Sequence, residues 1–265
     1  MAPTYLDEIL THHRARAARD TRVWQDRLSE TRYEGRSLLG ALRSDVNPYV
    51  KVIAEVKRHS PSRGWLAPDL DAASCAQIYE GAGAAAISVL TDEAHFKGSR
   101  HDFEAVHASS TLPLLRKDFT VSANDVLDTA ALGAAGVLLI VAALSDDELT
   151  QFVALADQCG IDALVEVHDH VEAQRALSAG ARLIGVNQRD LHTFVVNPER
   201  AVAVRAALPD DIVTVAESGL RTRHDVIEVA EAGFDAVLVG EAFVRAAEPA
   251  ATVHSFANVV ASVHG

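Results

Sequence analysis

A single (β/α)8 TIM barrel, preceded by an extra N-terminal helical segment, is the α/β architecture that this 265-residue sequence predicts. Eight short apolar stretches rich in β-branched residues are separated by polar loops and amphipathic stretches, which is the pattern of a parallel sheet buried on both faces. Glycines end the intervening helices a few residues before the next strand, as helix-terminating glycines do. Eight such units in a chain of this length fit one closed barrel.

The N-terminal segment is predicted to be helical from residue 4 to about residue 44, with a break near residue 34. Leu6 and Ile9 have helical spacing, and an Asn-Pro pair ends the segment before the first strand. We therefore predict two regions, a helical extension packed on the barrel (1–48) and a catalytic barrel (49–265).

The strands follow in regular order after this extension. They are predicted at residues 50–56, 85–90, 112–116, 136–141, 162–167, 182–186, 212–217 and 235–239. The helix-ending glycines are Gly83, Gly133, Gly160, Gly180 and Gly233. Ser145 with Glu148, and Asp169 with Glu172, resemble capping boxes at helix starts. An open, doubly wound sheet is the competing fold, but it needs a glycine-rich loop after the first strand, and residues 58–61 (RHSP) do not form one.

Composition and charge exclude several classes of function. A formal net charge of −13 argues against a nucleic acid or an anionic membrane as partner, because both require a basic face. The longest apolar run, from Ala130 to Leu144, is shorter than the ~20 residues of a membrane helix. Two cysteines without a CxxC motif, and no secretory signal, predict a reduced, cytoplasmic protein.

Polar residues stand at the predicted carboxyl ends of the strands, where barrels of this kind hold their active sites. Glu55 and Lys57 alternate along the first strand and so point to one side. The later strands supply Thr91, Lys117, Glu166, Asn187, Arg189, Glu217 and Ser218. Two of the four lysines are in this set, and a lysine among carboxylates can act as an acid, whereas arginine keeps its proton. The simpler, structural interpretation is that these lysines and carboxylates form salt bridges at the barrel rim and that Asn187 only closes a turn.

Small residues follow the last two strands, in Glu217-Ser218-Gly219 and Val239-Gly240-Glu241. Many barrels bind phosphate at this position through backbone N–H groups, so a phosphorylated substrate is the leading interpretation. His168 and His170 stand beside Asp169 at a helix start and are not predicted to bind a metal. The pair His12-His13 is predicted to lie on a solvated face.

Several longer motifs, in order along the chain, carry a resemblance to a known family. They are Ile53-Ala54-Glu55-Val56-Lys57-Arg58 with Ser60-Pro61-Ser62; Leu90-Thr91-Asp92 with Phe96; Leu115-Arg116-Lys117-Asp118-Phe119; Leu164-Val165-Glu166-Val167-His168; Gly185-Val186-Asn187 with Arg189-Asp190-Leu191 and Thr193-Phe194; and Ala216-Glu217-Ser218-Gly219. Over almost its whole length the sequence resembles the indole-3-glycerol phosphate synthase family.

The resemblance implies a carboxy-lyase that converts 1-(2-carboxyphenylamino)-1-deoxyribulose 5-phosphate to indole-3-glycerol phosphate without a cofactor or metal. It implies Lys117 as general acid, Glu166 as base, and Lys57 as a charge partner of the substrate that shares the acid role. Glu55, Asn187 and Glu217 would orient the lysines and hold hydroxyl groups. The substrate-binding residues would be Ser62, Phe96, Phe119, Arg189 and Ser218, with Gly219, Gly240 and Glu241 at the phosphate. The resemblance also implies a monomer or weak oligomer that can contact other enzymes of the tryptophan pathway.

One segment departs from the family. An Asp-Pro-Tyr-Gln-like segment usually opens the third helix, whereas this chain has Ser122-Ala123-Asn124-Asp125, in which Ser122 and Asp125 are predicted to cap the helix instead. General tryptophan supply and a specialised pathway both fit such a change. Two other hypotheses stay open: another phosphosugar barrel enzyme, either an isomerase or an aldolase with Lys117 as Schiff-base amine, and a paralogue that binds a ligand or partner without turnover.

Overall fold

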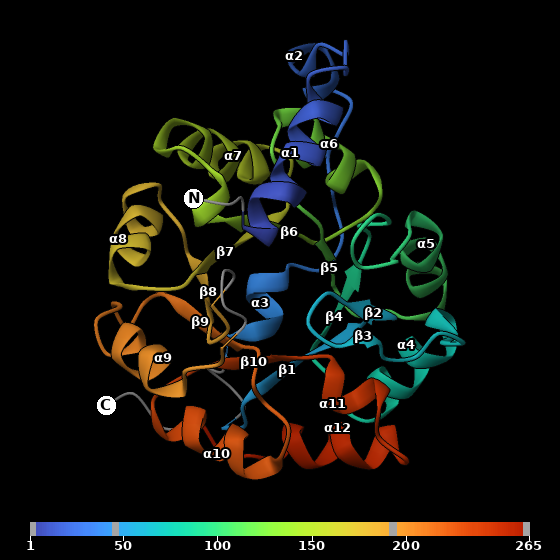
Figure 1. Cartoon of the computed structure of the whole chain (residues 1–265), viewed down its shortest axis with the longest axis vertical. Helices are drawn as coiled ribbons and strands as arrows, with labels where there is room; N and C mark the ends of the chain where they lie inside the picture. The colour runs from blue at the N-terminus through green and yellow to red at the C-terminus, as the bar shows by residue number, and fades with distance from the viewer. Residues whose placement is uncertain (1–3, 44–47, 191–194, 262–265) are drawn as a thin grey trace.

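The computed structural model describes residues 4–43, 48–190 and 195–261. Eight parallel strands close into a barrel in the order β1-β10-β9-β8-β7-β6-β5-β4 (Figure 1), which confirms the predicted fold. Each strand ends within two residues of its predicted bounds. The strands are β1 (Lys51–Val56), β4 (Ala86–Leu90), β5 (Leu114–Lys117), β6 (Gly136–Ile140), β7 (Asp162–Val167), β8 (Leu183–Asn187), β9 (Val213–Glu217) and β10 (Ala236–Val239).

Helices surround the barrel and connect successive strands. They are α4 (Ala72–Gly81), α5 (Arg100–Ser109), α6 (Ala123–Ala131), α7 (Asp146–Gln158), α8 (His170–Ser178), α9 (Pro198–Arg205), α10 (Arg223–Glu231), α11 (Glu241–Val244) and α12 (Pro249–Ala257), with a 3-10 turn η1 (Val141–Ala143). The five predicted helix-ending glycines all have φ between 75° and 95°, a conformation that favours glycine.

Helix capping follows the sequence signals with one correction. Ser145 and Glu148 form the predicted capping box at the start of α7. Asp169 caps α8 through the N–H of Glu172, but the Glu172 carboxylate accepts from the backbone N–H of His168 rather than that of Asp169. The second predicted box is therefore wrong in its return bond. The imidazole of His168, which also contacts Glu172, draws the carboxylate one residue further back.

Two apolar cores result from the alternation of side chains along each strand. On β1, Val52, Ala54 and Val56 point outward and belong to the core between barrel and helices. Ile53 points inward and belongs to a second core inside the barrel. Because this period is two, Glu55 also points into the barrel, two positions beyond Ile53 toward the carboxyl end.

The extension before β1 is not the nearly continuous helical segment that was predicted. It forms three short helices, α1 (Tyr5–Ala17), α2 (Trp24–Leu28) and α3 (Leu38–Leu42), joined by loops. After α1 the backbone N–H of Arg22 donates to the side chain of Asp20, a local bond that competes with the helix. Between α2 and α3 the N–H of Tyr33 donates to the carbonyl of Cys159, so that this stretch bonds to the barrel's helical layer.

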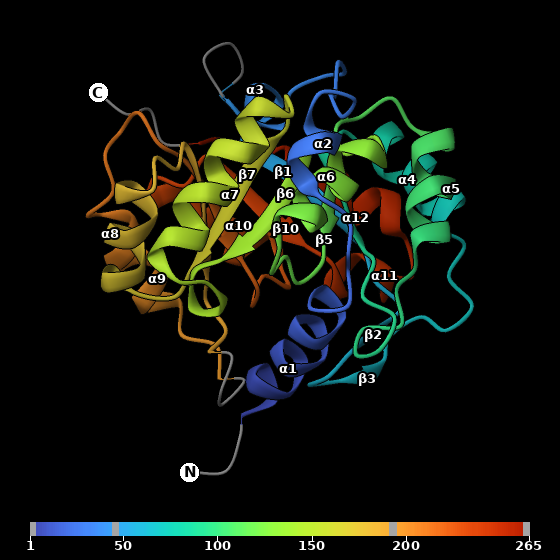
Figure 2. The same ribbon diagram turned by 90° about the horizontal axis from the view of Figure 1, so that it is seen from above.

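Helices α1 and α3 cover opposite ends of the barrel (Figure 2). Leu38 and Leu42 of α3 have no exposed surface and pack into the inner core at the amino-terminal end. The hydroxyl of Ser37 and the backbone N–H of Leu39 both donate to Asp162, the first residue of β7. Helix α3 therefore closes this end of the barrel, and α1 lies over the end that carries the site.

A two-stranded antiparallel hairpin, β2 (His59–Ser60) and β3 (Gly64–Trp65), was not predicted from the sequence. The sequence showed a turn at this point, and Gly64 has the positive φ (70°) that such a turn needs.

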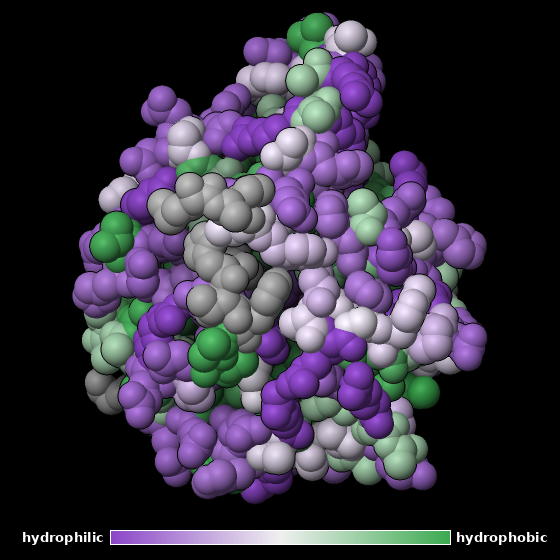
Figure 3. Space-filling view, in the orientation of Figure 1, coloured by the Kyte–Doolittle hydropathy of each residue, from purple (hydrophilic) through white to green (hydrophobic). Residues whose placement is uncertain are grey.

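The face of the molecule over which α1 lies is mainly hydrophilic (Figure 3). None of the helices in the described part of the chain is long and apolar enough to cross a membrane.

Closure of the barrel by α3 leads to a testable expectation for Leu38→Ala. The substitution removes a fully buried side chain and leaves a cavity beside Gly136, so we expect it to lower the free energy of unfolding by about 2–5 kcal/mol. Urea denaturation measures this loss. Leu39→Ala, at the adjacent and only partly buried leucine, is the matched control and should lose distinctly less. Equal losses for the two variants would contradict the assigned packing.

Candidate active site

The site continues the inward-facing rows of the inner core toward the carboxyl ends of the strands. Leu115, Leu164 and Val215 belong to that core, and the residues two positions further on are Lys117, Glu166 and Glu217. The apolar interior of the barrel is thus replaced by charged groups over a single step along several strands. This geometry explains why residues far apart in the sequence meet.

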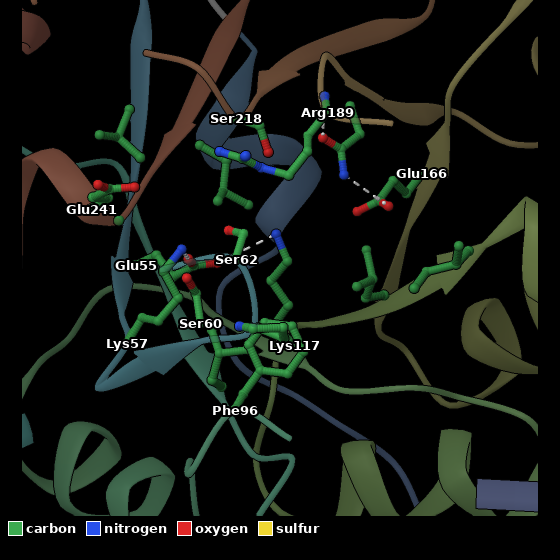
Figure 4. Close-up of a pocket in the computed structure, with 18 of the residues that line it drawn as sticks. Glu55, Lys57, Ser60, Ser62, Phe96, Lys117, Glu166, Arg189, Ser218 and Glu241 are labelled. Carbon is green, nitrogen blue, oxygen red and sulfur yellow. Dashed lines mark hydrogen bonds and ion pairs between the residues drawn. The ribbon is translucent and has the colours of Figure 1, made fainter. Parts of the chain in front are cut away.

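A single cavity brings together nearly all the predicted site residues (Figure 4). Of the predicted set, the cavity is lined by Glu55, Lys57, Ser62, Phe96, Lys117, Phe119, Glu166, Asn187, Arg189, Ser218, Gly219, Gly240 and Glu241. Glu217 does not line it, but its carboxylate accepts a hydrogen bond from Lys117, which does. In Figure 4 the side chain of Lys117 lies between Glu55 and Glu166.

Four charged side chains form a buried ion-pair cluster. Nζ of Lys57 lies 2.6 Å from Oε1 of Glu55, and Nζ of Lys117 lies 3.3 Å from Oε2 of the same carboxylate. Lys117 also donates to Oε2 of Glu217 at 3.0 Å. Glu55 and Glu217 are 2% and 1% exposed, so both carboxylates depend on the lysines for compensation of their charge.

The surroundings shift the pKa values of Glu55 and Glu217 in opposite directions. Burial alone would raise the pKa of Glu55, but the neighbouring Lys117 and Lys57 ammonium groups hold it at about 2. Burial would lower the pKa of Lys117, but the Glu217, Glu55 and Glu166 carboxylates raise it above its ordinary value. For Glu217, burial together with the Glu166 and Glu55 charges outweighs Lys117 and raises the pKa to about 7. Groups with such separated pKa values are typical of acid–base sites.

Glu166 is held from two sides by neutral or titratable partners. Nδ2 of Asn187 donates to its Oε1 at 3.1 Å, and Oδ1 of Asn187 accepts from the N–H of Arg189. Nε2 of His168 lies 3.5 Å from the same carboxylate oxygen, while Nδ1 of this ring contacts Glu172 at 3.0 Å. Burial would lower the pKa of His168, but Glu172 and Glu166 raise it overall.

His168 was therefore missed as a neighbour of the site. From the sequence it was considered as a metal ligand and as part of a family motif, but not as a contact of Glu166, although its position two residues after Glu166, directly beyond the end of β7, was a usable signal.

Two glycines make room for the carboxylates. A Cβ on Gly185 of β8 would overlap Oε1 of Glu217, and one on Gly240 would lie 2.6 Å from Oε1 of Glu55. Neither distance is compatible with a real side chain at the glycine. Glycine at both positions is thus required by the close approach of a charged group, not by backbone conformation.

The carboxyl ends of β9 and β10 have the features of an anion-binding turn. Ser218 and Gly219 both have positive φ (66° and 77°), which is uncommon for serine and turns the chain sharply after Glu217. The short helix α11 begins directly after Gly240. Arg63 lies near this end, with its Nε 3.7 Å from Glu241.

The cavity also has an apolar side. The rings of Phe96 and Phe119 lie 6.0 Å apart between centroids. Tyr5, Leu6 and Ile9 of α1 line the same cavity, and these residues were not predicted to be part of the site. Their helical spacing was evident in the sequence, but nothing in it showed which surface that face covers.

Comparison with known proteins identifies the family. The sequence model described as indole-3-glycerol phosphate synthase matches residues 6–256. The chain belongs to this family. Proteins named indole-3-glycerol phosphate synthase are similar to it at 50% identity in Parafrankia sp. (strain EAN1pec), over 81% of this chain and 79% of that one. In Mycobacterium ulcerans (strain Agy99) the identity is 44%, over 96% and 94%.

Solved structures of low sequence identity share the fold. A 3-hexulose-6-phosphate synthase has a TM-score of 0.64 at 16% identity, covering 80% of this chain and all of that chain. Thiamine phosphate pyrophosphorylase from Pyrococcus furiosus has a TM-score of 0.59 at 17% identity, covering 79% and 94%. Both show the barrel architecture alone. Of the motifs that carried the family resemblance, Leu191, Thr193 and Phe194 lie outside the described residues.

The segment that departs from the family pattern has a defined role in this fold. The Ser122 side chain caps α6 by accepting from the N–H of Asp125, as predicted. The predicted capping box lacks its return bond, because Asp125 accepts from the hydroxyl of Ser122 and the N–H of Val121 rather than from the N–H of Ser122. Asp125 also pairs with Arg16, and Asn124 accepts from Arg27. The departure from the family pattern therefore coincides with a surface on which the N-terminal extension docks.

The raised pKa of Glu217 gives a prediction for stability against pH. Because this pKa is about 7 in the folded protein and 4.5 as an ordinary carboxyl, the folded state binds more protons between these values. The stability contribution of Glu217 is thus complete below pH 4.5 and is lost as pH rises through 7. Glu217→Gln removes this loss, so its stability relative to wild type should rise over that interval by about 3 kcal/mol, at about 1.4 kcal/mol per pKa unit.

Urea denaturation of both proteins at several pH values across this interval tests the expectation. Glu104→Gln, at an exposed carboxylate on α5, is the matched control and is expected to change stability little at any of them. Parallel pH profiles for Glu217→Gln and wild type would show that folding does not raise the pKa of Glu217.

Proposed function

We propose that this chain is an indole-3-glycerol phosphate synthase of tryptophan biosynthesis, acting as a carboxy-lyase. Its substrate is 1-(2-carboxyphenylamino)-1-deoxyribulose 5-phosphate, and its products are indole-3-glycerol phosphate, carbon dioxide and water. One observation carries the proposal: Lys117 is held between Glu55 and Glu217 in the cavity, with Glu166 also close enough to raise its pKa. An acid and a base thus share one enclosed space.

The cavity accommodates the three parts of this substrate. Its aromatic ring fits between Phe96 and Phe119, which lie at the apolar side next to α1. Its phosphate fits the turn after β9 and the start of α11, where Ser218, Gly219 and Gly240 offer backbone N–H groups and Glu241 offers its own. Its two ends are thus held by different physical means, stacking and hydrogen bonding.

The substrate's polar groups lie between these ends. Its carboxylate pairs with Lys57, and Arg189 assists there with Ser62 beside it. Its hydroxyls are held by Glu55 and Asn187, whose carboxylate and amide groups reach the cavity. Binding in an enclosed site also excludes water, which strengthens these charge interactions.

The reaction requires proton donation to oxygen and then proton removal from carbon. Lys117 protonates the ketone oxygen as the carboxyl-bearing ring carbon attacks the carbonyl carbon, so that a carbon–carbon bond and a hydroxyl form. Loss of carbon dioxide from that ring carbon restores aromaticity. Lys57, which shares the acid role, then protonates the hydroxyl so that it leaves as water, and Glu166 removes a proton from the adjoining carbon, which completes the indole. Glu217 keeps Lys117 in position.

The same site also bears on the two other hypotheses, an aldolase and a paralogue without turnover. An aldolase that uses Lys117 as a Schiff-base amine needs a neutral amine, whereas the surrounding carboxylates raise the pKa of Lys117 and favour the ammonium form. A paralogue without turnover would have little reason to keep this buried cluster, which is expensive to desolvate. Both observations favour the lyase.

Substitution of Lys117 tests the proposal directly. Lys117→Met removes the acid, and Lys117→Arg keeps the charge but cannot release the proton, so we expect both to lower kcat at least 100-fold. Growth of indole fluorescence after mixing with the carboxyphenylamino-deoxyribulose phosphate measures turnover, with circular dichroism to verify folding.

The control for this experiment is Lys51→Met, because Lys51 stands at the opposite end of β1 and should leave turnover intact. No fluorescence growth with folded wild-type protein would overturn the proposed reaction. In that case, trapping of wild type by borohydride with a phosphorylated ketose would identify the aldolase.

The close approach of Gly185 and Glu217 gives a second test. Gly185→Ala forces the Glu217 carboxylate away from its place, and Lys117 loses its 3.0 Å partner. We expect kcat to fall by about 10-fold or more, corresponding to at least ~1.4 kcal/mol of lost transition-state stabilisation. Gly81→Ala in α4 meets nothing within 4 Å and is the matched control, with unchanged kinetics. Unchanged kcat in Gly185→Ala would remove Glu217 from the proposed machinery.

A further inference from the structure

Three potential metal ligands converge where the N-terminal extension meets the loop between β4 and α5. Nε2 of His13, on α1, lies 2.9 Å from Oδ2 of Asp92, and Nδ1 of His95 lies 3.2 Å from the same oxygen. His13 and Asp92 are 5% and 3% exposed, and His95 is half-buried. The prediction that His13 lies on a solvated face is therefore wrong, because that ring faces the barrel while His12 faces solvent.

We propose that His13, Asp92 and His95 bind a divalent transition-metal ion, with Zn²⁺ as the best fit. Imidazole nitrogens and a carboxylate oxygen are the ligands that such ions prefer, and all three atoms lie within 4.8 Å of one another. In a tetrahedral site with metal–ligand bonds of about 2.0–2.1 Å, neighbouring ligand atoms are about 3.3 Å apart. The separations of 2.9 and 3.2 Å in this cluster are close to that length, so an ion needs little rearrangement.

The surroundings orient the carboxylate as an outer shell does in metal sites. Oδ1 of Asp92 accepts the backbone N–H groups of His95 and Phe96, at 2.6 and 2.8 Å. These two bonds fix the carboxylate plane and leave Oδ2 directed at the two imidazoles. Both histidines thus meet an oxygen that is already held in place by the backbone.

The second nitrogen of His13 supports a metal over a hydrogen bond alone. A bond to Asp92 needs a proton on Nε2, and the buried Nδ1 then has no hydrogen-bond partner. A metal on Nε2 moves the proton to Nδ1, which lies 4.0 Å from Oδ1 of Asp118. Metal binding with a small shift of the ring therefore creates the carboxylate–histidine–metal arrangement that is usual in such sites.

An ion can reach this position from solvent. A cleft lined by His12, His13, Asp92 and Glu93, among others, opens beside the cluster. The ring of His12 lies 5.4 Å from that of His13 and 5.7 Å from that of His95, between centroids. Water or His12 would supply the fourth ligand.

The ion would join two segments that are far apart in the sequence. His13 belongs to the extension, and Asp92 and His95 belong to the loop that carries Phe96 into the cavity. Binding would thus stabilise the folded state, since the unfolded chain does not hold these ligands together. The inference does not depend on the proposed reaction.

Amide substitutions separate metal binding from hydrogen bonding. The amide nitrogen of His13→Gln falls near Nε2, and that of His95→Asn falls near Nδ1, so both variants keep a donor for Asp92 and lose the imidazole ligand. After treatment with EDTA, each full-length protein is titrated with Zn²⁺ by calorimetry and with Co²⁺ by visible absorption, and its thermal midpoint is measured. His224→Ala, at an exposed histidine on α10, is the control for binding to surface histidines.

We expect wild type and His224→Ala to bind one Zn²⁺ per chain at this site and to show the intense Co²⁺ bands of a low-coordinate site. At a hundredfold excess over Kd, their thermal midpoint should rise by on the order of 5 °C. The two amide variants should fold in EDTA with near wild-type midpoints and lose these responses. Binding of equal affinity in both amide variants, or no binding by wild type, would overturn the proposal and leave a hydrogen-bonded His–Asp–His cluster.

Discussion

The placement of Lys117 between two buried carboxylates is the constraint on which the rest of the site depends. An ammonium group and the Glu55 and Glu217 carboxylates can leave water only if each lies within ion-pair distance of a partner. The closed barrel supplies that geometry, because neighbouring parallel strands end at one level and their inward rows converge. It also demands glycine at Gly185 and Gly240, where any side chain would occupy the space of a carboxylate. The barrel fold and the charged site therefore depend on the same packing contacts.

Different helices of the N-terminal extension cover the two ends of the barrel, and they have different roles there. Helix α3 fills the amino-terminal end with leucines, and its bonds to Asp162 fix it to the start of β7. An apolar plug there keeps water out of the inner core beneath the charged layer, where a low dielectric strengthens the ion pairs. Helix α1 lies over the other end, with Leu6 and Ile9 facing the cavity. Stability and enclosure of the site therefore both involve residues outside the repeating strand–helix units.

Sequence reasoning succeeded where periodicity decides structure and failed where tertiary contacts do. Short, nearly continuous apolar stretches separated by helical segments predicted all eight strands, and the polar residues at their carboxyl ends, Glu55, Lys117 and Glu166 among them, were expected to meet at one end of the barrel. Both signals are local and do not depend on distant parts of the chain. Before the barrel, the break predicted near residue 34 coincides with the loop between α2 and α3, where the carbonyl of Cys159 accepts from Tyr33. The unbroken helix predicted ahead of that break was wrong, because the chain also leaves helical structure between Ala17 and Trp24, where Arg22 pairs with Asp128, 106 residues away. His13 was assigned to solvent for the same reason: its partner Asp92 is 79 residues away.

The shapes of the two ends of the cavity depend on different features. One end depends on hydrogen bonds to α1, and the other depends on backbone φ angles and glycines. Hydrogen bonds of this helix reach the segments that follow β4, β5 and β6: His13 contacts Asp92, Arg16 contacts Asp125 at the start of α6, and Arg14 donates to the carbonyls of Val121 and Ala143. Phe96 lies in the segment after β4, Phe119 lies just beyond β5, and Lys117 is the last residue of β5. The opposite end consists of the backbone turn after β9 and the first turn of α11, whose geometry comes from φ angles and glycine. Changes in the extension, or in residues 122–125 on which it docks, therefore act first on the proposed ring site and on Lys117, while the proposed phosphate end keeps its shape.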